Sequence, residues 1–343
     1  MRHNNFMYAL NDMNFRSDIG LFRVLVIFLL LVFHSFCPYG NYWRDIGLDV
    51  PLYYWLDNWS YSFFLQGFIF ISGYLYGIQL PKKKAKGLYN IKEELKKKFH
   101  RLMIPSLLFS SLYIVLFREG EGWRTPYKII NGVGHLWFLP TLFGCFVCLL
   151  LIDRWGIKPK IVILFSLLFS LIPLQGLPIR FDMVCKYFIF FYIAYLGSGV
   201  NLLDKIPKWT LFELGLFQIL LFVVLFGVER RETGLMEKVY ILPRLFEILY
   251  SSIGVIVLFS LVRKISRRIN SLSTEKVISF ANEYSFGVYI YQQFILWYLY
   301  YYTQLPFTIS QYTLPWLFLI ITLVISILLT YISKHIKYLN NII

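Results

Sequence analysis

The sequence predicts an all-α polytopic membrane protein, a bundle of about ten transmembrane helices. Hydrophobic residues make up 58% of the 343 residues and charged residues only 15%, whereas soluble domains are about 45–50% apolar and about 25% charged. Mean hydropathy is +0.59, and the apolar residues gather in stretches long enough for a helix to cross a hydrocarbon core of about 30 Å. Because lipid offers no partner to backbone polar groups, these stretches are expected to be helices.

Ten segments along the chain have this character. They lie near residues 19–37, 59–80, 102–118, 135–152, 161–175, 187–203, 209–228, 245–262, 277–301 and 314–333. The fifth is short and closes with PLQGLP, and the ninth carries Asn282, Glu283 and Gln292. The first 18 residues lack the apolar region and cleavage site of a signal peptide. With no internal repeat or linker, we expect one domain over 1–343, its helix bundle covering about 15–335.

The basic residues predict the orientation of the chain. With the N-terminus in the cytoplasm, the cytoplasmic tails and loops hold 23 Lys and Arg, and the outer loops hold 10. The positive-inside rule therefore favours two cytoplasmic termini. The net charge of +15 is mostly a consequence of topology, and the basic loop PKKKAKGLYNIKEELKKKFHR is interpreted as a surface beside anionic lipid, not as a nucleic-acid site.

The cysteines predict no metal or redox site. Cys145 and Cys148 form a C-x-x-C, but they lie within an apolar segment and no second pair accompanies them. Small apolar core residues are the better interpretation of both.

Arg23 and His34 are the most informative polar residues, because both lie in the first apolar segment. Eleven residues separate them, which is about three helical turns plus 20°, so they share one stripe about 16 Å apart along the axis. Ionisable groups inside a span are costly and usually face a partner, the bundle interior or a water-filled cavity. Taken singly, Arg23 is explained by snorkelling to the membrane interface and His34 by a structural hydrogen bond. The presence of both residues on one stripe predicts a polar path from the cytoplasmic side to the middle of the membrane.

Further polar residues are candidates for the same path. Lys98 and Arg101 are three residues apart at the cytoplasmic start of the third segment, a spacing that puts both on one helix face and suits a phosphorylated ligand or lipid headgroups. His135 and Trp137 begin the fourth segment, at the predicted outer interface, and Ser72 lies among large apolar residues in the second.

These landmarks, in this order, resemble the acyltransferase family 3 of integral membrane enzymes. The matching elements are Arg23 with His34, the stretch FIFISGY at 68–74, Lys98 and Arg101 followed by Pro105, the H-x-W-F-L element from His135 to Leu139, and YSFGVYIYQQFIL, which resembles the family pattern S-[YF]-G-x-Y-L-x-H. The likeness covers about residues 15–335.

Two positions depart from the family pattern. Lys98 stands where the family's R-x-x-R element has an arginine, so the charge is kept but the bidentate fork is lost. The family's late histidine is assigned to Tyr291, followed by two glutamines; a tyrosine keeps hydrogen bonding but transfers no proton easily near neutral pH.

The resemblance implies an O-acyltransferase that is integral to the plasma membrane, which in bacteria is the inner membrane. Its donor would be cytoplasmic acyl-CoA, commonly acetyl-CoA, with no bound cofactor and no metal, and its acceptor a hydroxyl of a surface polysaccharide or a lipid-linked saccharide. Histidine suits a general base near neutral pH, so His34 is the candidate base or transient acyl carrier, and Arg23 is the second candidate catalytic residue. Donor binding is expected from Lys98, Arg101 and Ser72, and the acceptor side from His135, Trp137, Glu283 and Tyr291.

Two other functions fit the same residues. A flippase or exporter of a lipid-linked saccharide would also use intramembrane charge, a basic rim and aromatic lining, although the sequence lacks the inverted repeat typical of such transporters. A family member that binds glycan without catalysis is the other alternative, because of the departure at Tyr291.

The predicted topology can be tested with reporter fusions. Fusions at residue 90 and at the C-terminus are expected to report a cytoplasmic location, and a fusion near residue 235 an outer one. A cytoplasmic signal at residue 235 would contradict the assignment of spans.

Overall fold

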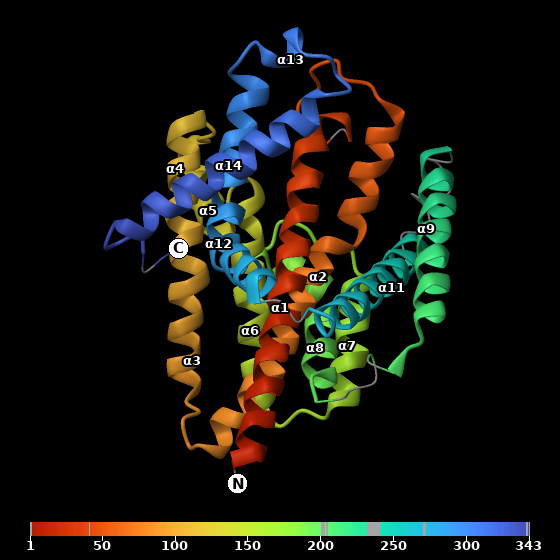
Figure 1. The fold of residues 1–343 in the computed structure, drawn as a ribbon. Coiled ribbons are helices and arrows are strands. Elements are labelled where there is room, and N and C mark those ends of the chain that lie inside the picture. The colour runs from red at the N-terminus through yellow and green to blue at the C-terminus, as the bar shows by residue number, and fades with distance from the viewer. Residues whose placement is uncertain are drawn as a thin grey trace. The chain divides into compact units, whose positions relative to one another are not determined.

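The computed structural model describes residues 2–40, 42–199, 203, 205–231, 241–269, 272–340 and 342, and all regular structure in these residues is helical (Figure 1). The position of the proposed fusion at residue 235 lies outside them. The chain forms two compact units: residues 1–68, 200–236 and 246–331 make unit 1, and residues 69–199, 237–245 and 332–343 make unit 2. Because each unit is assembled from separate stretches of chain, neither is a contiguous domain, and a single domain stays a prediction.

Unit 1 holds the helices of the two ends of the chain. They are α1 (Arg2–Phe36), most of α11 (Ile241–Ser266) and of α14 (Leu314–His335), and all of α9 (Lys208–Arg231), α12 (Leu272–Tyr301) and α13 (Leu305–Thr308). The long α2 (Pro51–Ala85) begins in unit 1 and continues into unit 2. Unit 2 also contains α3 (Ile91–Lys98), α4 (Ile104–Phe117), α5 (Thr125–Asn131), α6 (Phe138–Trp155), α7 (Pro159–Leu171) and α8 (Phe181–Gly197).

Each of the ten predicted segments overlaps a helix, although 161–175 and 187–203 extend beyond the ends of theirs, and the number of membrane spans is not confirmed. Among the described residues, seven helical stretches are long and apolar enough to cross a membrane: Asp18–Tyr39, Pro51–Ala85, Ile91–Phe117, Gly134–Trp155, Lys208–Gly227, Ile241–Ser266 and Leu314–His335. The other three predicted segments correspond to α7, α8 and α12. Of these, α7 has 13 residues and α8 has 17, fewer than the roughly 20 that a span needs. Polar residues lower the hydropathy of α12, which has 30 residues.

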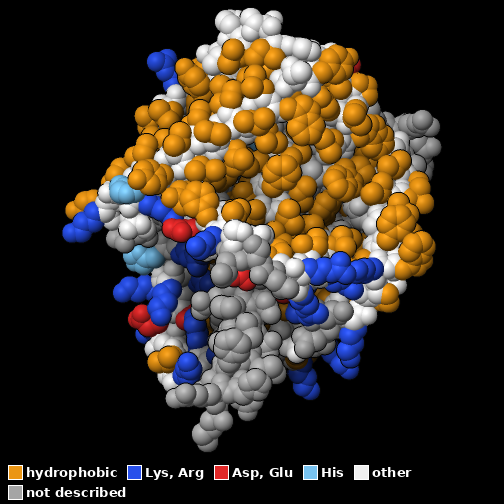
Figure 2. All heavy atoms as spheres, viewed as in Figure 1, with side chains coloured by type: hydrophobic (Ala, Val, Ile, Leu, Met, Phe, Trp, Pro, Cys, Tyr) orange, Lys and Arg blue, Asp and Glu red, His pale blue; other side chains and the backbone are white. Residues whose placement is uncertain are grey.

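Apolar side chains are abundant at the surface, as expected of a membrane protein. Figure 2 shows a broad area of hydrophobic side chains on one face, with Lys and Arg side chains grouped outside it. Helix α9 is an example, since only 17% of its most apolar window is buried within the protein. The remaining apolar surface of α9 is available to lipid.

Helices α1 and α12 pack along each other in parallel. Gly20 lies against Ile278 and Asn282 near the start of both helices, and the Tyr300 hydroxyl donates to the backbone carbonyl of Ser35 (2.6 Å) near their ends. Residue numbers therefore rise in the same direction along both helices. This arrangement aligns the polar residues of α12 with the stripe on α1.

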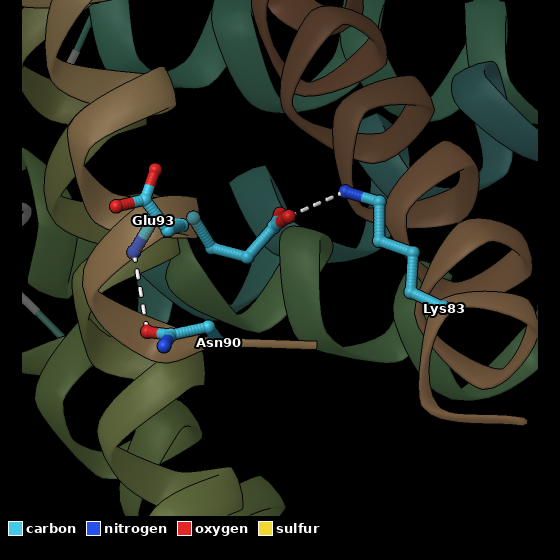
Figure 3. A network of polar contacts seen from close by, with 4 residues as sticks. Lys83, Asn90 and Glu93 are labelled. Carbon is cyan, nitrogen blue, oxygen red and sulfur yellow. Dashed lines mark hydrogen bonds and ion pairs between the residues drawn. The ribbon is translucent and has the colours of Figure 1, made fainter. Parts of the chain in front are cut away.

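Ion pairs and a helix cap order the basic loop in unit 2. The Asn90 side chain accepts hydrogen bonds from the backbone N–H of Lys92 and Glu93 and so caps α3 (Figure 3). Lys83, on the last turn of α2, pairs with Glu94 at 2.7 Å, a contact that Figure 3 also shows. The predicted basic loop is thus partly neutralised by its own carboxylates.

A π-helical turn, Phe99–Met103, joins α3 to α4. Pro105 follows it and has no N–H to bond the carbonyl of Arg101, and its ring would clash with that carbonyl in a regular α-helix. The wider turn avoids the clash, and the N–H of Ile104 bonds instead to the carbonyl of Phe99. Such turns occur frequently at functional sites.

Two glycines of α2 have different surroundings. A Cβ on Gly73 would overlap the backbone carbonyl of Phe191 on α8, whereas a Cβ on Gly67 would meet only side-chain atoms of α1, at 3.4 Å and beyond. Of these two, Gly73 is therefore the one required for close approach of two backbones.

We predict that Gly73→Ala destabilises the protein and that Gly67→Ala does not. Overpacking against a backbone that cannot move aside costs about 1–3 kcal/mol, while Gly67→Ala gains helix propensity. Thermal denaturation of both variants in detergent tests this. Equal melting temperatures would contradict the close packing of α2 on α8.

Candidate active site

Two side-chain hydrogen bonds join α1 to α12 at the predicted polar stripe. Arg23 Nη1 donates to Asn282 Oδ1 at 3.0 Å, and His34 Nδ1 lies 2.9 Å from Gln292 Oε1. The partners are ten residues apart on α12, about 15 Å along the axis, which nearly matches the 16 Å between Arg23 and His34 on α1. The stripe therefore faces a matching pair of amide side chains.

The hydrogen bond to Gln292 determines which nitrogen of His34 is basic. An amide oxygen only accepts, so Nδ1 carries the proton and donates it to Oε1. The basic lone pair is then on Nε2. His34 is 7% exposed and Gln292 is fully buried, so water competes little with this bond.

Aromatic rings surround His34 in unit 1. The Phe33 ring lies 5.0 Å from the imidazole and the Trp43 ring stacks on it at 6.0 Å with an interplanar angle of 20°. Trp43 in turn packs edge-on against Trp297 of α12 (5.3 Å), and the Arg44 guanidinium lies over the Trp297 ring (5.4 Å). The surroundings of the imidazole are therefore largely aromatic.

A charged pair lies five residues before Arg23, near the middle of α1. Asp18, 5% exposed, pairs with Arg263 of α11 at 3.5 Å, and Arg263 also lies over the Phe259 ring. Glu283 is exposed and directly follows Asn282, the partner of Arg23. Glu283 therefore lies nearer the Asn282 contact with Arg23 than the Gln292 contact with His34 along α12.

The late motif faces His34 through Gln292, not through Tyr291. Counted from Ser285, the eighth position of S-[YF]-G-x-Y-L-x-H is Gln292, so the sequence-based assignment of that position to Tyr291 was displaced by one residue. Tyr291 is half-buried, one residue from the contact. The sequence contained a signal for Asn282 and Gln292, because both are polar residues in an otherwise apolar helix with a spacing close to that of Arg23 and His34.

In unit 2, Lys98 and Arg101 have different surroundings. The Lys98 ammonium lies 3.9 Å from the centre of the Phe146 ring and 5.2 Å from that of Tyr76. Arg101 is exposed. The π-helical turn between them changes the rotation per residue, so the three-residue spacing does not give the shared helix face that the sequence predicted. Arg101 is the more accessible of the two cations.

The other predicted residues of unit 2 lie on α2 and on the 3₁₀ turn before α6. Ser72 is half-buried on α2, next to Gly73, where α2 meets α8. His135 is 5% exposed, and Trp137 stacks on Tyr187 of α8, with ring centres 6.3 Å apart. His135 and Trp137 belong to the turn Gly134–Trp137, and their location on the acceptor side stays a prediction.

Comparison with known proteins gives one match. The model of the acyltransferase 3 family, described as an acyltransferase domain, matches residues 16–335. No curated protein and no solved structure matches the chain. The matched range begins in α1 before Arg23 and ends with α14, so it contains both units' candidate residues.

The match extends over nearly the whole chain and agrees with the apolar helices and with the buried histidine on α1. The protein therefore belongs to the acyltransferase 3 family and is a membrane acyltransferase.

Proposed function

We propose that this acyltransferase uses acyl-CoA, acetyl-CoA in the first instance, to acylate a hydroxyl group of a surface polysaccharide or a lipid-linked saccharide. The observation that carries this proposal is the buried hydrogen bond from His34 Nδ1 to Gln292 Oε1. It gives the chain an oriented imidazole with its basic nitrogen defined, which is what acyl transfer to an alcohol requires.

The proposed reaction assigns one proton to His34. Nε2 accepts the proton of the acceptor hydroxyl as its oxygen attacks the thioester carbonyl. When the tetrahedral intermediate collapses, the C–S bond breaks and the leaving thiolate takes the proton back from the imidazolium. The products are an ester and CoA thiol, with no net change in protons and no additional reactant.

The basic residues support a phosphorylated donor. Arg23 is held in place by Asn282, and Arg101 is exposed on the basic segment between α3 and α4. A guanidinium can bind phosphate through two parallel N–H groups. Lys98 packs on Phe146. We therefore expect Lys98 to add positive charge beside that segment and not to contact the donor directly. Both termini in the cytoplasm would put these groups on the side where acyl-CoA is made.

Arg23 and His34 are expected to fail in different ways. His34→Ala removes the base, so acyl transfer should fall by at least about a hundredfold with donor binding nearly unchanged. Arg23→Ala should weaken donor binding as well. We would measure acyl-CoA binding and acylation of glycan extracted from a strain that lacks the gene, using purified monodisperse protein.

The same measurements can reject the proposal. Full activity in His34→Ala would exclude catalysis by this residue. Wild-type protein that moves lipid-linked saccharide across vesicles without forming an ester would identify a transporter instead.

Gln292 is expected to act as a positioning residue. Gln292→Leu keeps the size but removes the acceptor for Nδ1–H, so the imidazole can turn and exchange tautomers; kcat should fall by about tenfold or more with little change in KM. Gln292→Glu keeps an acceptor and should retain more activity than Gln292→Leu. Steady-state kinetics with both substrates checks this.

A matched control for this test is Gln218→Leu. Gln218 is also buried in unit 1, where its Oε1 accepts from Trp59 Nε1 at 3.1 Å. Equal losses of kcat in Gln292→Leu and Gln218→Leu would show that the effect is one of stability and not of orienting His34.

A further inference from the structure

A strained segment precedes α8 in unit 2. Ile179 and Arg180 have φ angles of 57° and 53°, in the left-handed region, which is unfavourable for residues with a Cβ and most of all for a β-branched one. The N–H of Arg180 donates to the side-chain oxygen of Asn131 at 3.1 Å, and Asn131 is itself buried. Backbone strain of this kind persists only where surrounding contacts impose it, and it is concentrated at functional sites.

This strained backbone places the Arg180 side chain on an aromatic stack. The guanidinium carbon lies 5.3 Å from the centre of the Trp137 ring. Trp137 also stacks on Tyr187, at 6.3 Å and an interplanar angle of 26°, and the Lys186 ammonium lies 5.4 Å from the Tyr187 ring. Two cations and two rings thus form one cluster, in which the contact with Trp137 restrains the Arg180 guanidinium.

One donor of the Arg180 side chain has no partner among the described residues. This donor, Nε, is buried. Oδ1 of the buried Asp182, two residues later, likewise has no donor there. Buried polar atoms normally have partners, and an exception requires an explanation. Arg244, 4% exposed, donates to the carbonyls of Ser170 and Lys186 and adds a further positive charge at this end of α8.

We propose that Arg180, held on the Trp137 ring, binds an anionic oxygen group, phosphate or carboxylate, of the acceptor saccharide. Among the described residues of this cluster, Arg180, Lys186 and Arg244 are basic and Asp182 is acidic. A planar guanidinium matches the two oxygens of either anion, and Asp182 is suited to accept a bond from a neighbouring sugar hydroxyl. This inference rests on the proposed function, and it narrows the acceptor to an acidic or phosphorylated saccharide.

The test compares sugar binding by full-length protein in nanodiscs of neutral lipid. The probes are glucuronate for the carboxylate, glucose 1-phosphate for the phosphate and glucose as the uncharged reference. Wild-type protein should bind at least one charged probe about tenfold more tightly than glucose, the usual scale for a charge-assisted hydrogen bond, and Arg180→Gln should lose this preference. Because binding needs no turnover, this readout is independent of whether acyl transfer occurs.

A matched control is available in the same unit. Arg124 lies 5.1 Å over the Trp123 ring, and Trp123 is 84% exposed, so Arg124→Gln removes an arginine stacked on a tryptophan in a solvent-exposed setting. It should bind all probes as the wild type does. Arg180→Lys keeps the charge without the planar fork and should keep part of the preference, and it serves as the test if Arg180→Gln does not fold.

The remaining outcomes overturn the proposal. A wild type without preference for the charged probes, or equal behaviour of Arg180→Gln and Arg124→Gln, removes the assigned role of Arg180. If phosphatidylglycerol in the nanodisc abolishes the preference, the anion bound at Arg180 is a lipid headgroup and not the acceptor.

Discussion

The structure depends on the requirement that polar groups inside an apolar bundle find partners within the protein. Arg23 and His34 meet it through two amides on α12, more than 250 residues away in the sequence. These bonds secure the parallel packing of α1 and α12, and the bond to Gln292 also orients the imidazole of His34. Fold and site therefore share one set of interactions, so the residues that orient His34 also hold α1 and α12 together.

The sequence predicted much of this arrangement. Hydropathy placed all ten helical segments, and helical periodicity put Arg23 and His34 on one stripe. The partners of that stripe were not predictable from local pattern, because a contact between α1 and α12 depends on how distant helices pack. The last position of the late motif was assigned to Tyr291 instead of Gln292 for a simpler reason: the motif is degenerate, and its alignment was shifted by one residue.

Unit 2 shows where periodicity fails for a physical reason. A spacing of three residues gives one face only in a regular α-helix, and the π-helical turn before Pro105 changes that geometry between Lys98 and Arg101. Pro105 is evident in the sequence, and its missing N–H indicates that the helix departs from regular α-helical geometry at this point. The left-handed conformation of Ile179 had no such signal, since isoleucine is among the residues least suited to it.

The parallel packing of α1 and α12 also restricts the possible numbers of membrane crossings. If α1 and α12 both cross the membrane, the chain between the end of α1 and the start of α12 must cross it an odd number of times. Five of the candidate spans among the described residues lie in this interval, which satisfies the parity. If these five stretches cross as well, α7 and α8 must cross together or not at all. If α14 also crosses, either case agrees with the prediction that both termini lie on the same side of the membrane.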